Sequence, residues 1–176
     1  METLRQTYLN GLGNLAGTGG LVTDKRPDNF LHIGLIKILF PDAKIIHTNR
    51  HPLDNILSLY FLHLNPDMAY ALDLRDSAHW YRQHQRLMAH WKSLYPADIF
   101  ELDYDQLVRD PRAVTAALLD FAGLEMEEAC LAPHATAGSV RTASVWQVRE
   151  PLNRRGSGRW RNYQHRIGEL IADLRA

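Results

Sequence analysis

AKIIHTNRHPLDNILSLY, residues 43–60, is the stretch of sequence that decides the fold. Residues 43–48 form a short, largely apolar run that favours a β-strand, and Arg50 follows almost at once. Pro52 then stands where the first position of a helix tolerates a missing N–H group. The stretch therefore predicts a strand that delivers an arginine to the start of a helix.

This strand–arginine–helix junction suits an anion. A helix N-terminus presents unpaired backbone N–H groups and a partial positive charge. Arg50 adds a planar cationic fork, and Ser58 adds a hydroxyl further along the helix. A phosphate or sulfate ester matches these groups. The same residues are also compatible with a surface arginine and with a serine that bonds its own helix backbone.

Size and composition predict a single globular domain over residues 1–176. The chain is 45% hydrophobic and 23% charged, with a formal net charge of zero. Because no global charge excess exists, nothing favours nucleic acid or an anionic membrane as a partner. No segment approaches the length of a membrane span, and the N-terminus lacks the pattern of an export signal.

The single cysteine, Cys130, cannot form a disulfide within the chain, which predicts a reducing, cytoplasmic location. Its neighbours in EEACLAP predict that it is a small buried hydrophobic residue. The nine histidines show no pair four apart on one helix and no cysteine cluster, so we expect no metal site.

The order of predicted elements indicates an α/β fold with a parallel sheet. Strands are predicted over 21–25, 43–48 and 98–104. Helices are predicted over 1–16, 29–40, 52–64, from Ser77 to about Leu94, and over 111–122 with Gly123 at the end. Three strands are few for a self-sufficient parallel sheet.

The C-terminal third is strongly basic. Between Arg141 and Arg166 there are seven arginines against one acid, Glu150. A Gly-Ser-Gly run at 156–158 precedes Trp160 and Tyr163, which predicts a basic loop anchored by aromatic side chains. Such a loop can be merely solvated, but with Arg50 upstream it favours an anion site.

Four blocks, TDKRP (23–27), NRHPLDNILSLY (49–60), DYDQLVRDP (103–111) and TASVWQVREPLNRRGSGRWRNY (142–163), together resemble the sulfotransferases. The resemblance is to the bacterial tetratricopeptide-linked and tyrosylprotein sulfotransferases. It implies a P-loop-like α/β domain, a parallel sheet flanked by helices. It also implies transfer of a sulfuryl group from 3′-phosphoadenosine 5′-phosphosulfate (PAPS) to a hydroxyl acceptor, such as a peptide, a glycan or a small alcohol.

The resemblance assigns roles to two pairs of residues. Arg50 and Ser58 match the family's ligands of the PAPS 3′-phosphate, in agreement with the anion site expected from the junction itself. Lys25 matches a lysine that stabilises the transferring sulfuryl group, where an ammonium offsets charge on the leaving phosphate. Ser144 matches a serine near the same sulfuryl oxygens.

Further nucleotide ligands follow from the resemblance. Gln147, Arg149 and Asn153 lie in the run that closes over the nucleotide. Tyr104 matches a tyrosine that lines the nucleotide site, and Arg159 matches a further 3′-phosphate ligand.

The chain also departs from the family pattern. Leu62 stands where a second arginine is expected. No loop rich in Gly, Ser and Thr follows a first strand to hold the 5′-phosphosulfate, and GLGNLAGTGG at 11–20 follows a helix-like stretch instead. We therefore expect an N-terminally incomplete sulfotransferase domain without an assignable general base. The alternative function is an inactive module that binds 3′,5′-ADP or PAPS through the 3′-phosphate.

Overall fold

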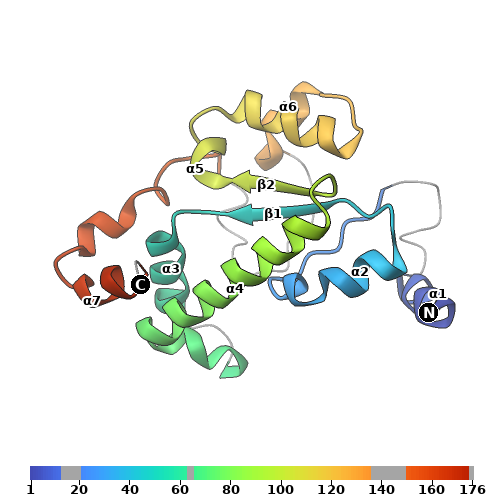
Figure 1. The fold of residues 1–176 in the computed structure, drawn as a ribbon. Helices are drawn as coiled ribbons and strands as arrows, with labels where there is room; N and C mark the ends of the chain where they lie inside the picture. The colour runs from blue at the N-terminus through green and yellow to red at the C-terminus, as the bar shows by residue number, and fades with distance from the viewer. Residues whose placement is uncertain (13–20, 63–65, 136–149, 175–176) are drawn as a thin grey trace. The chain divides into compact units, whose positions relative to one another are not determined.

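We describe the fold from a computed structural model of the chain (Figure 1). The structure describes residues 1–12, 21–62, 66–135 and 150–174. The chain divides into two compact units, which we describe separately. The first unit comprises Met1–Ile45 and Gln83–Ile99, and the second comprises Ile46–Arg82 and Phe100–Ala176.

The α-helices and strands in chain order are α1 (Glu2–Leu12), α2 (Ile33–Leu39), β1 (Ile45–Asn49), α3 (Pro52–Leu62), α4 (Leu74–Leu94), β2 (Ile99–Asp103), α5 (Tyr104–Leu107), α6 (Pro111–Ala122) and α7 (Gly168–Asp173). The 3₁₀ helices are η2 (Asn29–His32), η3 (Pro66–Leu72), η4 (Glu128–Leu131), η5 (Pro133–Ala135) and η7 (Arg159–Tyr163). No helix within the described ranges is long and apolar enough to cross a membrane.

The two strands β1 and β2 pair side by side and run parallel (Figure 1). This pairing confirms the strands expected over 43–48 and 98–104 and the parallel α/β class. The strand expected over 21–25 is wrong, because residues 21–26 have no regular structure and are all exposed. A β-favouring composition does not make a strand where no side chain is buried and no neighbouring strand pairs with it.

The core of the first unit lies around α2 and the second half of α4. It contains buried Ile33, Met88 and Ile99, flanked by partly buried Phe30, Ile45, Trp91 and Tyr95. The Trp91 indole N–H donates to the Phe30 carbonyl at 2.8 Å, and its ring lies close to Gly34 of α2. The helical segment predicted over 29–40 is thus confirmed as η2 followed by α2.

A buried lysine joins the end of α2 to the beginning of the sheet. The Lys37 ammonium donates to the carbonyls of Pro41 and Ala43 and lies 2.9 Å from Asp98 Oδ2. The hydrogen bond from Lys37 lowers the pKa of Asp98 below its ordinary value, against the opposing effect of burial. This network satisfies a charge that would otherwise be costly to bury.

The core of the second unit brings together α3, the first half of α4 and α7. Its buried members are Leu53, Ile56, Leu57, Ala78, Ile167 and Leu170. Trp160 and Tyr163 pack against them, which confirms that aromatic side chains anchor the basic C-terminal loop.

The helix α4 begins one turn earlier than Ser77. The Asp73 carboxylate accepts hydrogen bonds from the backbone N–H groups of Arg75 and Asp76, at 2.7 and 3.1 Å. Ser77 is buried inside the helix, and its hydroxyl donates to the Tyr70 carbonyl at 2.8 Å. The Asp73 side chain therefore caps the N-terminus of α4.

The helix α6 has the boundaries that its capping residues predict. Asp110 accepts a hydrogen bond from the Ala113 N–H at 3.1 Å, and Gly123 adopts a left-handed φ of 71°. The following segment corrects one expectation: Cys130 is exposed. It lies in η4, a single turn whose Glu128 reaches Arg112 at the surface, so the turn stays in water.

Candidate functional site

Arg50 lies between the end of β1 and the start of α3, as the sequence predicts. Its Nη2 donates a hydrogen bond to the carbonyl of Gly156, in the C-terminal loop. Its guanidinium carbon lies 5.5 Å from the centre of the Tyr104 ring, within reach of a cation–π interaction. Its Nε is buried without a hydrogen-bond partner in the described part of the chain.

Tyr104 contacts the same loop as Arg50 does, from the end of the neighbouring strand. It is the first residue of α5, which begins directly after β2. Its hydroxyl donates to the Asn153 carbonyl at 3.0 Å. A Cβ atom on Gly156 would lie 3.3 Å from the Tyr104 hydroxyl and 3.4 Å from Arg50 Nη2. Glycine at 156 therefore lets the loop backbone approach both side chains, and two parallel strand ends meet one loop here.

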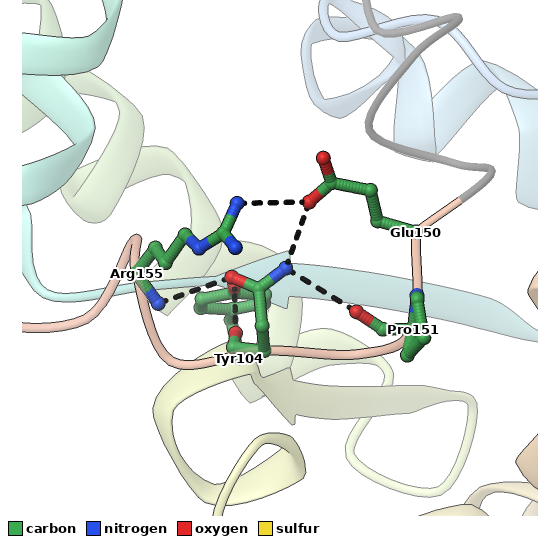
Figure 2. Close-up of polar contacts among 5 residues, drawn as sticks. Tyr104, Glu150, Pro151 and Arg155 are labelled. Atoms are coloured by element: carbon green, nitrogen blue, oxygen red, sulfur yellow. Dashed lines mark hydrogen bonds and ion pairs between the residues drawn. The ribbon is translucent and has the colours of Figure 1, made fainter.

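A polar network holds the preceding part of this loop (Figure 2). The Asn153 amide nitrogen donates to Glu150 Oε2 at 3.5 Å and to the Pro151 carbonyl at 3.2 Å, and its amide oxygen accepts from the Arg155 N–H at 3.1 Å. The Arg155 guanidinium lies 3.2 Å from the same Glu150 oxygen. With the bond to Tyr104, these contacts order the loop before it reaches Arg50.

His51 connects the start of α3 to two other segments. Its backbone N–H donates to Asp105 Oδ2 at 3.1 Å. Burial alone would raise the pKa of Asp105, but the Ser157 hydroxyl, the His51 N–H and the Arg50 charge together hold it below its ordinary value. The His51 ring stacks on Trp160 with centroids 5.2 Å apart and planes within 8°.

Asp54, in the first turn of α3, binds the loop directly. Its side chain is buried, with the residue 2% exposed. One carboxylate oxygen accepts from the Gly158 N–H at 2.6 Å and the other from the Trp160 N–H at 2.7 Å. We call this pair of bonds the Asp54 clasp.

The family is settled by comparison with known proteins. A family model described as "Sulfotransferase family" matches residues 1–128, which include three of the four sequence blocks. This chain belongs to the sulfotransferase family. The family predicted from the sequence blocks is thereby confirmed.

Two similar proteins were found for this sulfotransferase-family chain. An uncharacterized protein of Aquifex aeolicus (strain VF5) is 36% identical over 177 residues, a match that spans 99% of this chain and 23% of that protein. The solved "Sulfotransferase Domain from the Curacin Biosynthetic Pathway" superposes with a TM-score of 0.69 at 22% identity, covering 96% of this chain and 67% of that one. The second match confirms the sulfotransferase fold.

The structure brings together only some of the residues predicted for a sulfotransferase site. Arg50, Tyr104 and Asn153 lie in one network. Ser58 is partly buried on α3, two turns beyond Arg50. Lys25 is exposed in the irregular 21–26 segment of the first unit.

The remaining predicted ligands are placed elsewhere or not described. The Arg159 guanidinium lies over the ring of Phe61, 5.4 Å from its centre, in the last turn of α3. Ser144, Gln147 and Arg149 lie outside the described residues. Over the described ranges, no group of three metal-ligating side chains comes together.

Sequence reasoning missed the residues that hold the loop to α3. Asp54, His51 and Gly156 each contact a partner about 50 or 100 positions away along the chain. The available signals were an acid in a helix first turn and a glycine within an arginine-rich segment. Both are common features whose partners no local pattern identifies.

Proposed function

We propose that this chain forms the 3′-phosphate end of a PAPS site and takes part in sulfuryl transfer to a hydroxyl acceptor. Membership of the sulfotransferase family supports the type of reaction. The sequence blocks around Arg50 and Lys25 support PAPS as the donor. The acceptor class stays open among peptides, glycans and small alcohols.

One observation carries the proposal: residues at and beside the start of α3 carry buried polar atoms without hydrogen-bond partners. Among the described residues these atoms are Arg50 Nε, His51 Nδ1 and Trp160 Nε1, together with Asp105 Oδ1, whose other carboxylate oxygen accepts the His51 N–H. Arg50 and His51 are consecutive, and His51 stacks on Trp160. Buried donors are normally satisfied, so the unpartnered N–H groups of Arg50 and Trp160 favour a ligand with acceptor oxygens. His51 Nδ1 adds a third donor in the tautomer that carries its proton there.

The helix adds to this preference. The first N–H groups of a helix are unpaired and carry partial positive charge, which stabilises a phosphate placed beside them. Arg50 provides the full positive charge, and its guanidinium can bind two phosphate oxygens at once. Ser58 and Arg159 are the further 3′-phosphate ligands that we propose on family resemblance, with Tyr104 and Asn153 beside the nucleotide and Gln147 and Arg149 in the segment that closes over it.

In the proposed reaction the acceptor oxygen attacks the sulfur atom of PAPS. The bond between sulfur and the 5′-phosphate oxygen breaks, 3′,5′-ADP leaves, and the hydroxyl proton of the acceptor passes to water, since no residue of this chain is assigned as a general base. Lys25 offsets the charge that develops on the departing phosphate, and Ser144 contacts the sulfuryl oxygens. Arg50 holds the end of the nucleotide that does not react.

The test is titration calorimetry with 3′,5′-ADP and with adenosine 5′-phosphate, which lacks the 3′-phosphate. Arg50→Ala should weaken 3′,5′-ADP about tenfold or more, as expected for a lost charged hydrogen bond, and leave adenosine 5′-phosphate unchanged. Arg112→Ala, which removes an exposed arginine of the same unit, is the matched control. Absent binding, or equal binding by the Arg50 variant, would overturn the proposal.

A second measurement separates an enzyme from a binding module. Radiolabelled sulfate should pass from PAPS to hydroxyl-bearing acceptors if the chain catalyses the reaction. Binding of 3′,5′-ADP without transfer to any acceptor tested would favour the alternative, a module that holds the nucleotide by its 3′-phosphate.

A further inference from the structure

We propose that Asp54 is a positioning residue for the 3′-phosphate site, a role that rests on the phosphate binding proposed above. Asp54 acts through the 156–160 loop, which it fixes against the start of α3, and not by contact with the nucleotide.

The Asp54 clasp binds the loop backbone to α3 through two short hydrogen bonds. Each carboxylate oxygen accepts one backbone N–H, at 2.6 and 2.7 Å, from residues 104 and 106 positions further along the chain. Bonds to a carboxylate are shorter and stronger than neutral ones. The carboxylate also lies in the first turn of α3, where a negative charge interacts favourably with the helix dipole.

The clasp fixes the part of the loop that follows its contact with Arg50. Its two bonds hold the backbone at Gly158 and at Trp160 against the first turn of α3. Gly156, two residues before the clasp, is the residue whose carbonyl accepts from Arg50. Asp54 thereby sets where the loop backbone meets the Arg50 guanidinium.

The negative charge of Asp54 has an effect on the basic loop that a neutral residue could not have. The described segment from 150 to 166 carries arginines at 154, 155, 159, 161 and 166 against the single acid Glu150. These like charges repel one another when the loop is brought to Arg50. A buried carboxylate holds the loop in place and offsets part of this repulsion before any anion binds.

The first test is a double-mutant cycle between Asp54 and Arg50, read as the affinity for 3′,5′-ADP. Asn is nearly isosteric with Asp, but its NH₂ group cannot accept, so Asp54→Asn leaves one buried N–H unsatisfied. We expect about tenfold weaker 3′,5′-ADP binding by Asp54→Asn. In the Arg50→Ala background the same change should weaken binding less than about threefold, because the group that the loop orients is gone.

Two comparisons separate positioning from a general loss of structure. Adenosine 5′-phosphate should bind Asp54→Asn as it binds the wild type. Asp120→Asn, an equal charge change on the exposed end of α6, should leave both affinities unchanged. A positioning role would be refuted if Asp54→Asn lowered the affinity for 3′,5′-ADP equally with Arg50 present and with Arg50→Ala. It would also be refuted if Asp54→Asn lowered the affinities for 3′,5′-ADP and adenosine 5′-phosphate equally.

A measurement on the unmodified chain covers the case in which Asp54→Asn does not fold. Amide hydrogen exchange followed by NMR should show the Gly158 and Trp160 N–H groups protected in the free protein, and more strongly protected with 3′,5′-ADP. Exchange of these two amides at the rate of an unstructured peptide would overturn the inference. If the wild-type chain does not bind 3′,5′-ADP, the proposed function is refuted. If the wild type and Asp54→Asn bind 3′,5′-ADP equally, only the role of Asp54 is refuted.

Discussion

Gly156→Ala isolates the contact between the loop and Arg50. The added Cβ would lie 3.3 Å from the Tyr104 hydroxyl, 3.4 Å from Arg50 Nη2 and 3.5 Å from Arg50 Cζ. The contact with the Tyr104 hydroxyl is tighter than an ordinary van der Waals contact, whereas the two contacts with Arg50 are ordinary, so the Tyr104 side chain or the loop backbone has to shift by a few tenths of an ångström. We expect the loop to move away from Tyr104 and its Gly156 carbonyl to move away from the Arg50 guanidinium.

The size of the effect follows from the bonds that this shift weakens. Partial loss of the Arg50–Gly156 hydrogen bond costs about 0.5–1 kcal/mol, since a whole net hydrogen bond to a charged group contributes about 1.5–3 kcal/mol. We therefore expect the affinity for 3′,5′-ADP to fall about two- to fivefold. The free energy of unfolding should change less, because alanine restricts the unfolded chain and this restriction offsets about 0.4–1 kcal/mol.

The assay pairs titration calorimetry with urea unfolding, and Gly123→Ala is the control. Gly123 has a left-handed φ of 71° and no atom within 4 Å of the added Cβ, so its substitution strains only the backbone. We expect Gly123→Ala to lower the free energy of unfolding by about 1 kcal/mol and to leave binding unchanged. If Gly156→Ala lost stability while keeping full affinity, the reasoning about the loop and Arg50 would be wrong.

Two further predictions concern stability. Gly34→Ala should lower the free energy of unfolding by about 1 kcal/mol in urea titrations. The added Cβ would lie 2.8 Å from the Trp91 ring, and the overpacking cost of about 1–3 kcal/mol exceeds the gain of about 1 kcal/mol in helix propensity. Gly11→Ala, with nothing within 4 Å, is the control, and a Gly34 variant as stable as that control would contradict the packing. Acid should also lower the free energy of unfolding, because folding lowers the pKa values of Asp98 and Asp105 from 3.8. The stabilisation that these two carboxylates contribute is complete above that pH and is lost as the pH falls through their pKa values in the folded chain. Lys37→Met should flatten this acid dependence in urea midpoints measured against pH, and an unchanged slope would refute the Lys37–Asp98 contribution.

Local chemistry explains most of the secondary structure that could be predicted. Pro52 marks the start of α3, and Asp110 and Gly123 mark the two ends of α6, because each residue favours its position through its own backbone or capping preference. Arg50 and Tyr104 could be placed together for a topological reason. Both follow parallel strands, and the carboxyl ends of such strands meet at one edge of a sheet.

The errors arise where tertiary contacts decide. The 21–25 segment has a strand-like composition but buries no side chain, and Cys130 has apolar neighbours but lies in an exposed turn. Asp54 was missed for the related reason that its partners lie 104 and 106 residues away. An aspartate in the first turn of a helix looks like an ordinary surface acid until the loop that covers it is known.

The Asp54 clasp has a consequence for how the loop can change during evolution or design. Its acceptor oxygens meet main-chain N–H groups, which every residue except proline provides. The side chain at 160 can therefore be exchanged without removing its bond to Asp54, and at 158 the left-handed φ of 75° favours glycine whether or not Asp54 is present. The pair of positions would leave no covariation in an alignment, and a designer could vary the charge of the loop while keeping its attachment to α3 intact.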